Sequence, residues 1–392
     1  MKFKVAHRIK SVLGKGTAVE WARNLAKGGE DLIHMEIAEP NFAPPVHIIE
    51  AAKQAIEKTK FPYTDFQGLI ELREVIADYL ETEIGVRYDP YSEILVTSGA
   101  AEAIYITIQG IVDPGDEVIL LDPTYLTFEP CIMLAGGIVS RVPLIEESGW
   151  ALDLETLREK AGPKTKAIII NSPNNPTGTV FNKVEIEQIA EIACREDAIV
   201  IFDMVFDKII YDDIKLENIA ALPGMKDRTI LIGGFSKIYS MSGLRVGWLA
   251  GNAEIISALT NSLHLYVSIC ASIVAQEAAI AALKGPQDWL KGWIREYQER
   301  RDILVQTLNA IPGIKCQIPK GGFFVFPNIS AIEKDAYKFA QDLVKNAGIV
   351  VTPGSDYGPR GEGHVRMVFG AVSKAEVEEC VKRLKAYFGI SC

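Results

Sequence analysis

The sequence contains few of the residues that build metal sites and disulfide frameworks. Its 392 residues include only five histidines and six cysteines. No two histidines stand four residues apart, the spacing of a metal-binding pair on a helix. The cysteines lack the close pairs typical of zinc sites and dense disulfide scaffolds. We therefore expect no metal site, and reduced, mostly buried thiols at Cys131, Cys194, Cys270, Cys316, Cys380 and Cys392.

Long apolar runs and an excess of positive charge are also missing. No uninterrupted run of about 18 apolar residues is present to span a bilayer, and the opening MKFKVAHRIK lacks the apolar stretch of a signal peptide. The formal net charge of -10 repels the phosphates of nucleic acids and anionic lipids. We therefore expect a cytoplasmic protein with small-molecule partners and no nucleic-acid or membrane partner.

The rest of the composition is that of an average globular protein. Hydrophobic residues make up 48% and charged residues 23% of the chain, which disfavours disorder and fibrous structure. The length suggests two or three domains, enough to bury a full core and to hold a site between domains.

One pattern repeats between about residues 93 and 250: a short apolar run, a polar or glycine-containing turn, and a stretch with helical spacing. This alternation predicts an α/β fold with a mostly parallel sheet. Residues 183–195, with Ile186, Ile189, Ala190 and Ala193 on one side, are typical of a crossover helix. The predicted strands are residues 93–96, 117–121, 166–170, 198–202, 229–232 and 246–250.

The pattern changes after Gly285 and Pro286. A charged segment predicts a long helix to about residue 308, followed by strands near 322–326 and 365–369 and helices at 336–346 and 374–388. We expect a three-layer α/β/α large domain over residues 46–285. The smaller α+β domain would combine residues 1–45 with residues 286–392.

Polar residues follow several of the predicted strands directly, and ligands of open α/β sheets bind beyond the carboxyl ends of the strands. These residues are Ser98 to Ala101, the NSPNNPTG stretch from Asn171, Asp203, and Ser236 with Lys237. Each alone is explained by a turn, a cap or a surface lysine. Their occurrence at successive strand ends favours a binding site.

Two charged residues stand within apolar runs. Asp203 follows AIVIF, and a buried carboxylate is costly unless a positive group pairs with it. Arg366 lies in HVRMVF, where a guanidinium needs a carboxylate partner, either a ligand or a structural salt bridge.

Residues 236–247, SKIYSMSGLRVG, resemble the cofactor-lysine region of the pyridoxal-phosphate-dependent aminotransferases of fold type I, the class I/II family that includes aspartate and aromatic aminotransferases. Other motifs of that family occur in the same order and cover nearly the whole chain. They are AEPNF from residue 38, YTDFQG from 63, DPGDEV from 113, NNPTG from 174 and HVRMVFG from 364.

The resemblance implies a pyridoxal 5′-phosphate cofactor bound to Lys237 as a Schiff base. Lys237 would also move the proton of the substrate α-carbon, so it serves as anchor and general base. Asp203 would keep the pyridinium nitrogen protonated, and Tyr125 would stack on the ring. Asn175 would hydrogen-bond the phenolic oxygen. Gly99, Ala100, Ala101, Ser236 and Arg245 would hold the phosphate.

The resemblance also implies how the substrate binds. Arg366 would clamp the α-carboxylate bidentately, with Ala38 and Asn175 beside it. Tyr63 would reach the phosphate in the neighbouring subunit, which implies a homodimer with shared sites. At three positions the chain departs from the family pattern. Phe206 replaces a tyrosine that bonds the phenolic oxygen, Gly234 replaces a phosphate-binding serine, and Ala38 replaces a glycine.

Two other functions remain open for this sequence. Fold type I sites also support a β-lyase that acts on sulfur amino acids and releases pyruvate and ammonia. A non-catalytic cofactor-binding regulator would not need the lysine, arginine and aspartate together. Within the aminotransferase interpretation, the absence of a clearly placed lysine near Ala101 favours neutral or aromatic donors. Aspartate stays open, and glutamate with 2-oxoglutarate is one expected substrate pair.

Overall fold

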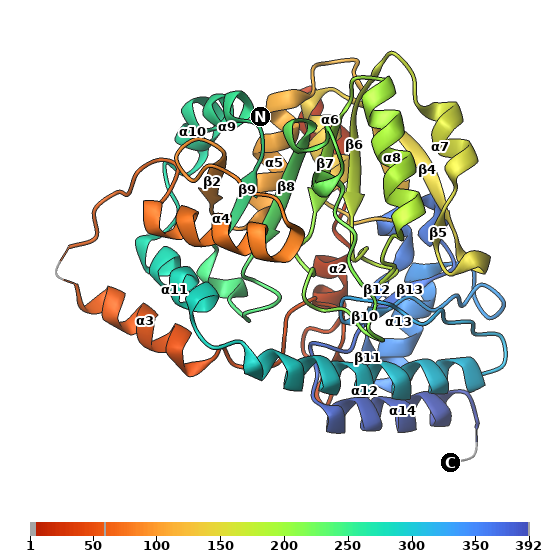
Figure 1. Cartoon of the computed structure of the whole chain (residues 1–392). Helices are drawn as coiled ribbons and strands as arrows, with labels where there is room; N and C mark the ends of the chain where they lie inside the picture. Colours follow the sequence, from red (N-terminus) through yellow and green to blue (C-terminus); the bar gives the residue numbers. More distant parts are fainter. Residues whose placement is uncertain (1–4, 59, 391–392) are drawn as a thin grey trace.

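The computed structural model describes residues 5–58 and 60–390. Residues 1–4 of the predicted small domain and Cys392 lie outside the described residues. Figure 1 shows a central sheet with helices packed around it, and below it in the view a smaller group of short strands and helices. The predicted α/β fold with an additional α+β part is confirmed.

The central sheet has eight strands. Most of them are parallel, but β9 is antiparallel to both its neighbours and β5 is antiparallel to β4. The repeating sequence pattern does not show this reversal, because a strand buried on both faces is apolar in either direction. In spatial order the strands are β2 (Ile94–Thr97), β9 (Gly247–Ala250), β8 (Thr229–Gly234), β7 (Ile199–Asp203), β6 (Thr165–Asn171), β3 (Glu117–Asp122), β4 (Ile138–Ile145) and β5 (Ala151–Leu152).

Helices bury both faces of this sheet. Alternate residues of one strand enter different hydrophobic clusters: Ile119 and Leu121 of β3 belong to one, Val118 and Leu120 to the other. This explains why the strands read as continuous apolar runs. The helices of this part of the chain are α3 (Val46–Glu57), α4 (Ile70–Ile84), α5 (Ala100–Ile111), α6 (Phe128–Ala135), α7 (Leu154–Lys160), α8 (Lys183–Arg195), α9 (Ala253–Leu259), α10 (Leu265–Val267) and α11 (Ile273–Lys284).

The smaller part joins both ends of the chain. β1 (Ile33–His34) pairs in parallel with β11 (Ile349–Val350), and β13 (Val365–Val368) lies between β10 (Phe324–Val325) and β12 (Thr352–Pro353). The long helix α12 lies beside α14 across the bottom of Figure 1. The exact domain boundaries stay a prediction. The helices here are α1 (His7–Val12), α2 (Ala18–Leu25), α12 (Asp288–Ala310), α13 (Ala336–Ala347) and α14 (Lys374–Tyr387).

Several predicted elements coincide with the observed ones. The predicted helix 183–195 is α8, which begins with a capping box in which Asn182 and Glu185 bond each other's backbone. Buried cysteines include Cys131, Cys316 and Cys380, whereas Cys194 is exposed. Within the described residues, no helix combines the length and apolarity that crossing a membrane requires, and no group of metal-binding side chains is found.

Candidate active site

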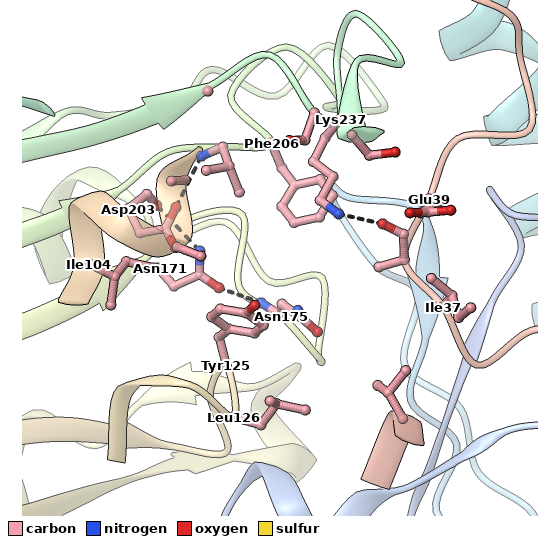
Figure 2. Close-up of a pocket in the computed structure, with 18 of the residues that line it drawn as sticks. Ile37, Glu39, Ile104, Tyr125, Leu126, Asn171, Asn175, Asp203, Phe206 and Lys237 are labelled. Atoms are coloured by element: carbon pink, nitrogen blue, oxygen red, sulfur yellow. Dashed lines mark hydrogen bonds between the residues drawn. The ribbon is translucent and has the colours of Figure 1, made fainter. Parts of the chain in front are cut away.

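A pocket opens at the carboxyl ends of the central strands. Figure 2 shows polar side chains from several loops converging on it. Asn171 and Asp203 end β6 and β7 and face each other in register, and Lys237 follows β8 three residues after Gly234. The cavity measures about 390 Å³, within the range of small-molecule sites. The sheet thus brings the strand-end residues of the sequence to one place.

Asp203 is a buried carboxylate with few hydrogen-bonding partners inside the protein. Its side chain is 2% exposed and accepts one hydrogen bond within the described residues, from the Val205 N–H at 3.1 Å. Burial raises the pKa of Asp203 to about 7, although the Val205 N–H and the positive charge of Lys237 act to lower it. A cationic group placed beside this carboxylate would relieve the cost of its burial.

The loop after β6 is held by its own asparagines. The Asn171 side chain accepts the N–H of Asn175 at 2.7 Å and donates to the backbone carbonyl of Asp203 at 3.3 Å. Asn175 is 5% exposed, and its side-chain oxygen accepts a hydrogen bond from Arg366 at 3.1 Å. Asn175 therefore connects the end of β6 to Arg366 through hydrogen bonds.

Lys237 points into the pocket beside Phe206 in Figure 2. Its ammonium donates to the carbonyl of Ala38. Burial is the main reason that the pKa of Lys237 falls to about 8, and the positive charges of Arg366 and Arg245 act in the same direction. A substantial fraction of the amine is therefore neutral near pH 8, the form that attacks a carbonyl.

A cradle for an anion lies at the start of α5. The N–H groups of Ala100 and Ala101 have no acceptor inside the helix, and the positive end of the helix dipole faces the pocket here. Gly99 has a φ of +89°, and a Cβ at that position would stand 2.6 Å from the Arg245 Nη2. Glycine at 99 therefore lets the Arg245 guanidinium lie against this helix end.

Arg366 is a buried cation without a carboxylate partner within the described residues. It is 2% exposed, and besides Asn175 it donates to the backbone carbonyl of Glu36 at 2.6 Å. Its guanidinium carbon lies 5.1 Å from the centre of the Tyr357 ring. The Nε–H is buried and has no hydrogen-bond acceptor. None of these contacts of Arg366 within the described residues is the structural salt bridge that was the alternative role for this residue.

Two aromatic side chains complete the walls. Tyr125 packs edge-on against Phe128, with ring centroids 5.6 Å apart, and it lines the pocket together with Leu126. Phe206, which is 2% exposed, packs edge-on against Phe323 and Phe324 at 5.2 and 5.4 Å. Phe206 has no hydroxyl to offer, so this wall of the pocket is apolar.

Eleven of the residues predicted from the sequence to bind the cofactor or the substrate line this pocket: Ala38, Ala100, Ala101, Tyr125, Asn175, Asp203, Phe206, Ser236, Lys237, Arg245 and Arg366. Gly99 lies just behind it, against Arg245. Tyr63 is not part of the lining and is 75% exposed. Its predicted role in a second subunit is untested within a single chain.

Several lining residues were not named as site residues from the sequence. Glu39 belongs to the AEPNF motif and Asn171 begins the NSPNNPTG stretch, so the sequence motifs indicate both residues. Gly16 and Val19 lie near the N-terminus, far from any motif, and no local pattern marks them. The full lining adds Gly16, Val19, Ile37, Glu39, Ile104, Leu126, Asn171, Val205, Gly234 and Ser242.

Comparison with known proteins gives one consistent result. The profile of a family described as "Aminotransferase class I and II" matches residues 30–384. An aspartate aminotransferase of Pyrococcus abyssi is 37% identical over 92% of this chain and 93% of its own. Aromatic-amino-acid aminotransferase 2 of Thermococcus litoralis is 35% identical, with the same coverage. A solved structure of an alanine aminotransferase from Pyrococcus furiosus has a TM-score of 0.91 and 32% identity, covering 98% of this chain and 100% of its own.

Proposed function

Because the chain belongs to the family of class I and II aminotransferases, we propose that it moves the amino group of an L-amino acid to a 2-oxo acid with pyridoxal 5′-phosphate bound at Lys237. The aminotransferase reaction follows from the family. The cofactor, the roles of the individual residues and the subunit arrangement are the proposal. A cytoplasmic location remains a prediction from the sequence.

The residues of the pocket fit this cofactor. Asp203 is buried without a cationic partner and would take the pyridinium N–H. The first turn of α5, Ser236 and Arg245 would take the phosphate, because open N–H groups, a hydroxyl and a guanidinium all suit an anion. Asn175 would reach the phenolic oxygen, and Tyr125 offers an aromatic face for the ring.

When bound, the cofactor supplies an aldehyde for the amino group and a ring that accepts electron density from the α-carbon. Arg366 would bind the α-carboxylate and so orient the substrate. Lys237 would hold the aldehyde of the cofactor and, once the substrate amine has taken its place there, its Nζ would hold and move the proton of the substrate α-carbon. Its lowered pKa makes the neutral amine available for this transfer.

The observation that carries the proposal is the pair of buried, uncompensated charges in one pocket. Asp203 lacks a cation and Arg366 lacks a carboxylate within the described residues. Buried charges are normally paired, so the pocket is built to receive a ligand with a cationic ring nitrogen and a carboxylate. An amino acid joined to pyridoxal 5′-phosphate has both.

The homodimer is supported by exposed aromatic side chains near Tyr63. Phe61 is 58% and Phe66 41% exposed, on the same loop as Tyr63. Large apolar side chains exposed together are typical of a surface that another chain covers. A homodimer measured by light scattering, in which Tyr63→Ala weakens cofactor binding, is the expected result. An active monomer would contradict this part of the proposal.

The test of the function uses Lys237→Ala and Lys237→Arg, with Lys183→Ala as the matched control because Lys183 is exposed on α8. We expect both Lys237 variants to lose transamination by about 10³-fold or more, while circular dichroism and the control stay unchanged. Transamination retained in the Lys237 variants would contradict the assignment. Pyruvate and ammonia released without an acceptor would instead identify a β-lyase.

A further inference from the structure

A buried ion pair lies behind the pocket, outside its lining. His364 comes two residues before Arg366, directly before β13, and is 5% exposed within one chain. Its Nε2 lies 3.2 Å from a carboxylate oxygen of Glu146, in the 3₁₀ turn η1 (Glu146–Ser148) that follows β4. Neither residue belongs to the described lining of the pocket. The pair therefore joins the strand that carries Arg366 to the central sheet.

The hydrogen bonds of His364 indicate that its ring is charged. Its Nδ1 lies 3.0 Å from the backbone carbonyl of Glu362, and a carbonyl oxygen only accepts hydrogen bonds. Its Nε2 meets the Glu146 carboxylate, which also receives an N–H of Asn328 at 2.8 Å. Burial acts to raise the pKa of Glu146, but the hydrogen bonds from His364 and Asn328 and the positive charge of Lys315 outweigh burial, and the net shift is downward. Glu146 is therefore an ionised acceptor, and both ring nitrogens of His364 donate.

Packed aromatic rings connect His364 to the Arg366 guanidinium. The His364 ring stacks on Phe326, with centroids 4.9 Å apart and an interplanar angle of 11°. Phe326 packs edge-on against Tyr357 at 6.1 Å, and the guanidinium carbon of Arg366 lies 5.1 Å from the centre of the Tyr357 ring. Protein interiors are close-packed and transmit strain. A displacement of the His364 ring would therefore displace the guanidinium.

The backbone gives a second connection between the two residues. Side chains of an extended chain alternate between its faces, so His364 and Arg366 point to the same side. Arg366 contacts Asn175 in the loop after β6, and His364 contacts Glu146 after β4. Both β6 and β4 pair with β3. The two contacts thus hold this stretch of chain against the central sheet at two nearby points.

We propose that His364, paired with Glu146, is a positioning residue that holds the Arg366 guanidinium where it binds the α-carboxylate of the substrate. The proposal rests on the proposed function, because it takes Arg366 as the carboxylate clamp. It adds a role for a pair of residues outside the pocket lining. Loss of the pair weakens carboxylate binding more than it slows the proton transfer at Lys237, since the carboxylate is the group that Arg366 holds.

The experiment mixes the cofactor-loaded protein with alanine, leucine, phenylalanine or aspartate, without an acceptor, and follows the cofactor absorbance in a stopped-flow instrument. For the most reactive of these amino acids, the concentration dependence gives an apparent dissociation constant and a limiting rate. The variants are His364→Phe, which keeps a flat ring on Phe326 but removes both N–H groups, and Glu146→Gln, which removes the charge but keeps an acceptor.

We expect His364→Phe to raise the dissociation constant by about 10- to 100-fold, because a small misplacement of a positioning group is costly, and to change the limiting rate much less. Glu146→Gln should give a smaller rise in the same direction. The matched control is Glu187→Gln on α8, at a glutamate that is 47% exposed, and it should change neither value. A limiting rate that falls as much as the affinity, or an unchanged affinity, would overturn the proposal.

A double-substitution cycle distinguishes positioning of Arg366 from a general packing role. Arg366→Lys removes the bidentate clamp. If His364 acts through Arg366, adding His364→Phe to Arg366→Lys should raise the dissociation constant much less than His364→Phe does alone. The same fold-increase in both backgrounds would overturn the proposal, because His364 would then act independently of Arg366.

The charge of His364 is measured without any substrate. The protein has five histidines, so the ring signals that disappear in His364→Phe identify this residue in ¹⁵N-resolved NMR spectra. We expect both ring nitrogens to carry a proton at neutral pH, and a neutral ring in Glu146→Gln. A neutral ring in the unmodified protein would overturn the ion pair.

Glu146→Gln covers the case in which His364→Phe does not fold, as judged by circular dichroism. It is then combined with Arg366→Lys in the same cycle, and additive effects on the dissociation constant would again overturn the proposal. The proposed function fails separately: in that case no amino acid of the panel would change the cofactor absorbance of the unmodified protein.

Discussion

Two buried carboxylates, Asp203 at the end of β7 and Glu102 in the first turn of α5, have different numbers of hydrogen-bond partners in the fold: Asp203 has few and Glu102 has several. Glu102, which is 9% exposed in the first turn of α5, accepts hydrogen bonds from His264 at 2.9 Å and Ser268 at 2.7 Å, and from the Ser98 N–H. Burial acts to raise its pKa, but these bonds outweigh burial and the net shift is downward. Asp203 has one such bond and a pKa of about 7.

The comparison separates a structural charge from a ligand-binding one. Glu102 is satisfied within the protein, and it fixes the backbone of Ser98 at the start of the anion cradle. Asp203 has one hydrogen bond, so its ionised form stays costly to bury until a cationic ligand group lies beside it. A carboxylate in a cleft whose pKa is strongly shifted is a candidate functional group. A carboxylate whose hydrogen bonds are satisfied within the protein has a structural role.

The largest expected effect is on catalysis. Asp203→Asn removes the negative charge that the cofactor ring nitrogen would meet, so we expect transamination to fall by about 10²-fold or more. Glu102→Gln keeps an acceptor at the same place and should stay within about tenfold of the unmodified protein. Steady-state rates of the two variants, measured side by side, check this. Equal losses would remove the distinction between the two carboxylates.

We expect the effects of the two substitutions on stability to rank in the opposite order, with Glu102→Gln more destabilising than Asp203→Asn. Glu102→Gln weakens the hydrogen bonds from His264 and Ser268 inside a buried site, so we expect the free energy of unfolding to fall by about 1–3 kcal/mol. Asp203→Asn removes a charge that is costly to bury, so the cofactor-free protein should be at least as stable as the unmodified one at pH 8. Urea unfolding of the cofactor-free variants measures both. Stabilisation by Glu102→Gln would contradict this account.

The two groups also predict different pH dependences for the cofactor-free protein. The folded state holds the Asp203 proton more tightly than the unfolded chain, so this group makes the free energy of unfolding fall as pH rises from about 4 to about 7. Glu102 contributes stability above its unfolded pKa and loses it as pH falls through its lowered folded pKa. The melting temperature of Asp203→Asn should therefore decline less between pH 5 and pH 7 than that of the unmodified protein. Identical declines would show that Asp203 does not titrate in this range.

A smaller effect concerns cofactor uptake. With its pKa near 8, Lys237 becomes neutral as pH rises, so the rate of cofactor incorporation into the free protein should increase from pH 7 and level off above pH 8. Absorbance after mixing with pyridoxal 5′-phosphate gives this rate. A rate that keeps rising to pH 10 would indicate an ordinary, solvated lysine.

The smallest expected effect comes from Phe206→Tyr. A hydroxyl beside the phenolic oxygen of the cofactor would favour its ionised form, so the pH at which the bound cofactor changes colour should move down by about one unit. The spectral titration of the two proteins checks this. A shift upward would place the new hydroxyl elsewhere in the pocket.

The sequence predicts the strand-end part of the site well and the remainder poorly, for a physical reason. Asp203 ends the apolar strand β7 and Lys237 closely follows the apolar strand β8, and the parallel pairing of β7 and β8 places their carboxyl ends at the same edge of the sheet. Val19 and Gly16 lie in an N-terminal segment in which Lys15 and Ala18 contact residues more than a hundred positions away. Such long-range contacts leave no periodic pattern in the sequence, so the sequence alone does not place Gly16 and Val19 at the pocket.

The most direct test of the account is the transfer of nitrogen itself. The loaded protein is mixed with a ¹⁵N-labelled donor such as leucine and an unlabelled 2-oxo acid, and the products are followed by mass spectrometry. We expect the label in the amino acid formed from the acceptor, and no transfer with Lys237→Ala. Label found only in free ammonia, or transfer that survives Lys237→Ala, would contradict the aminotransferase site described by this pocket.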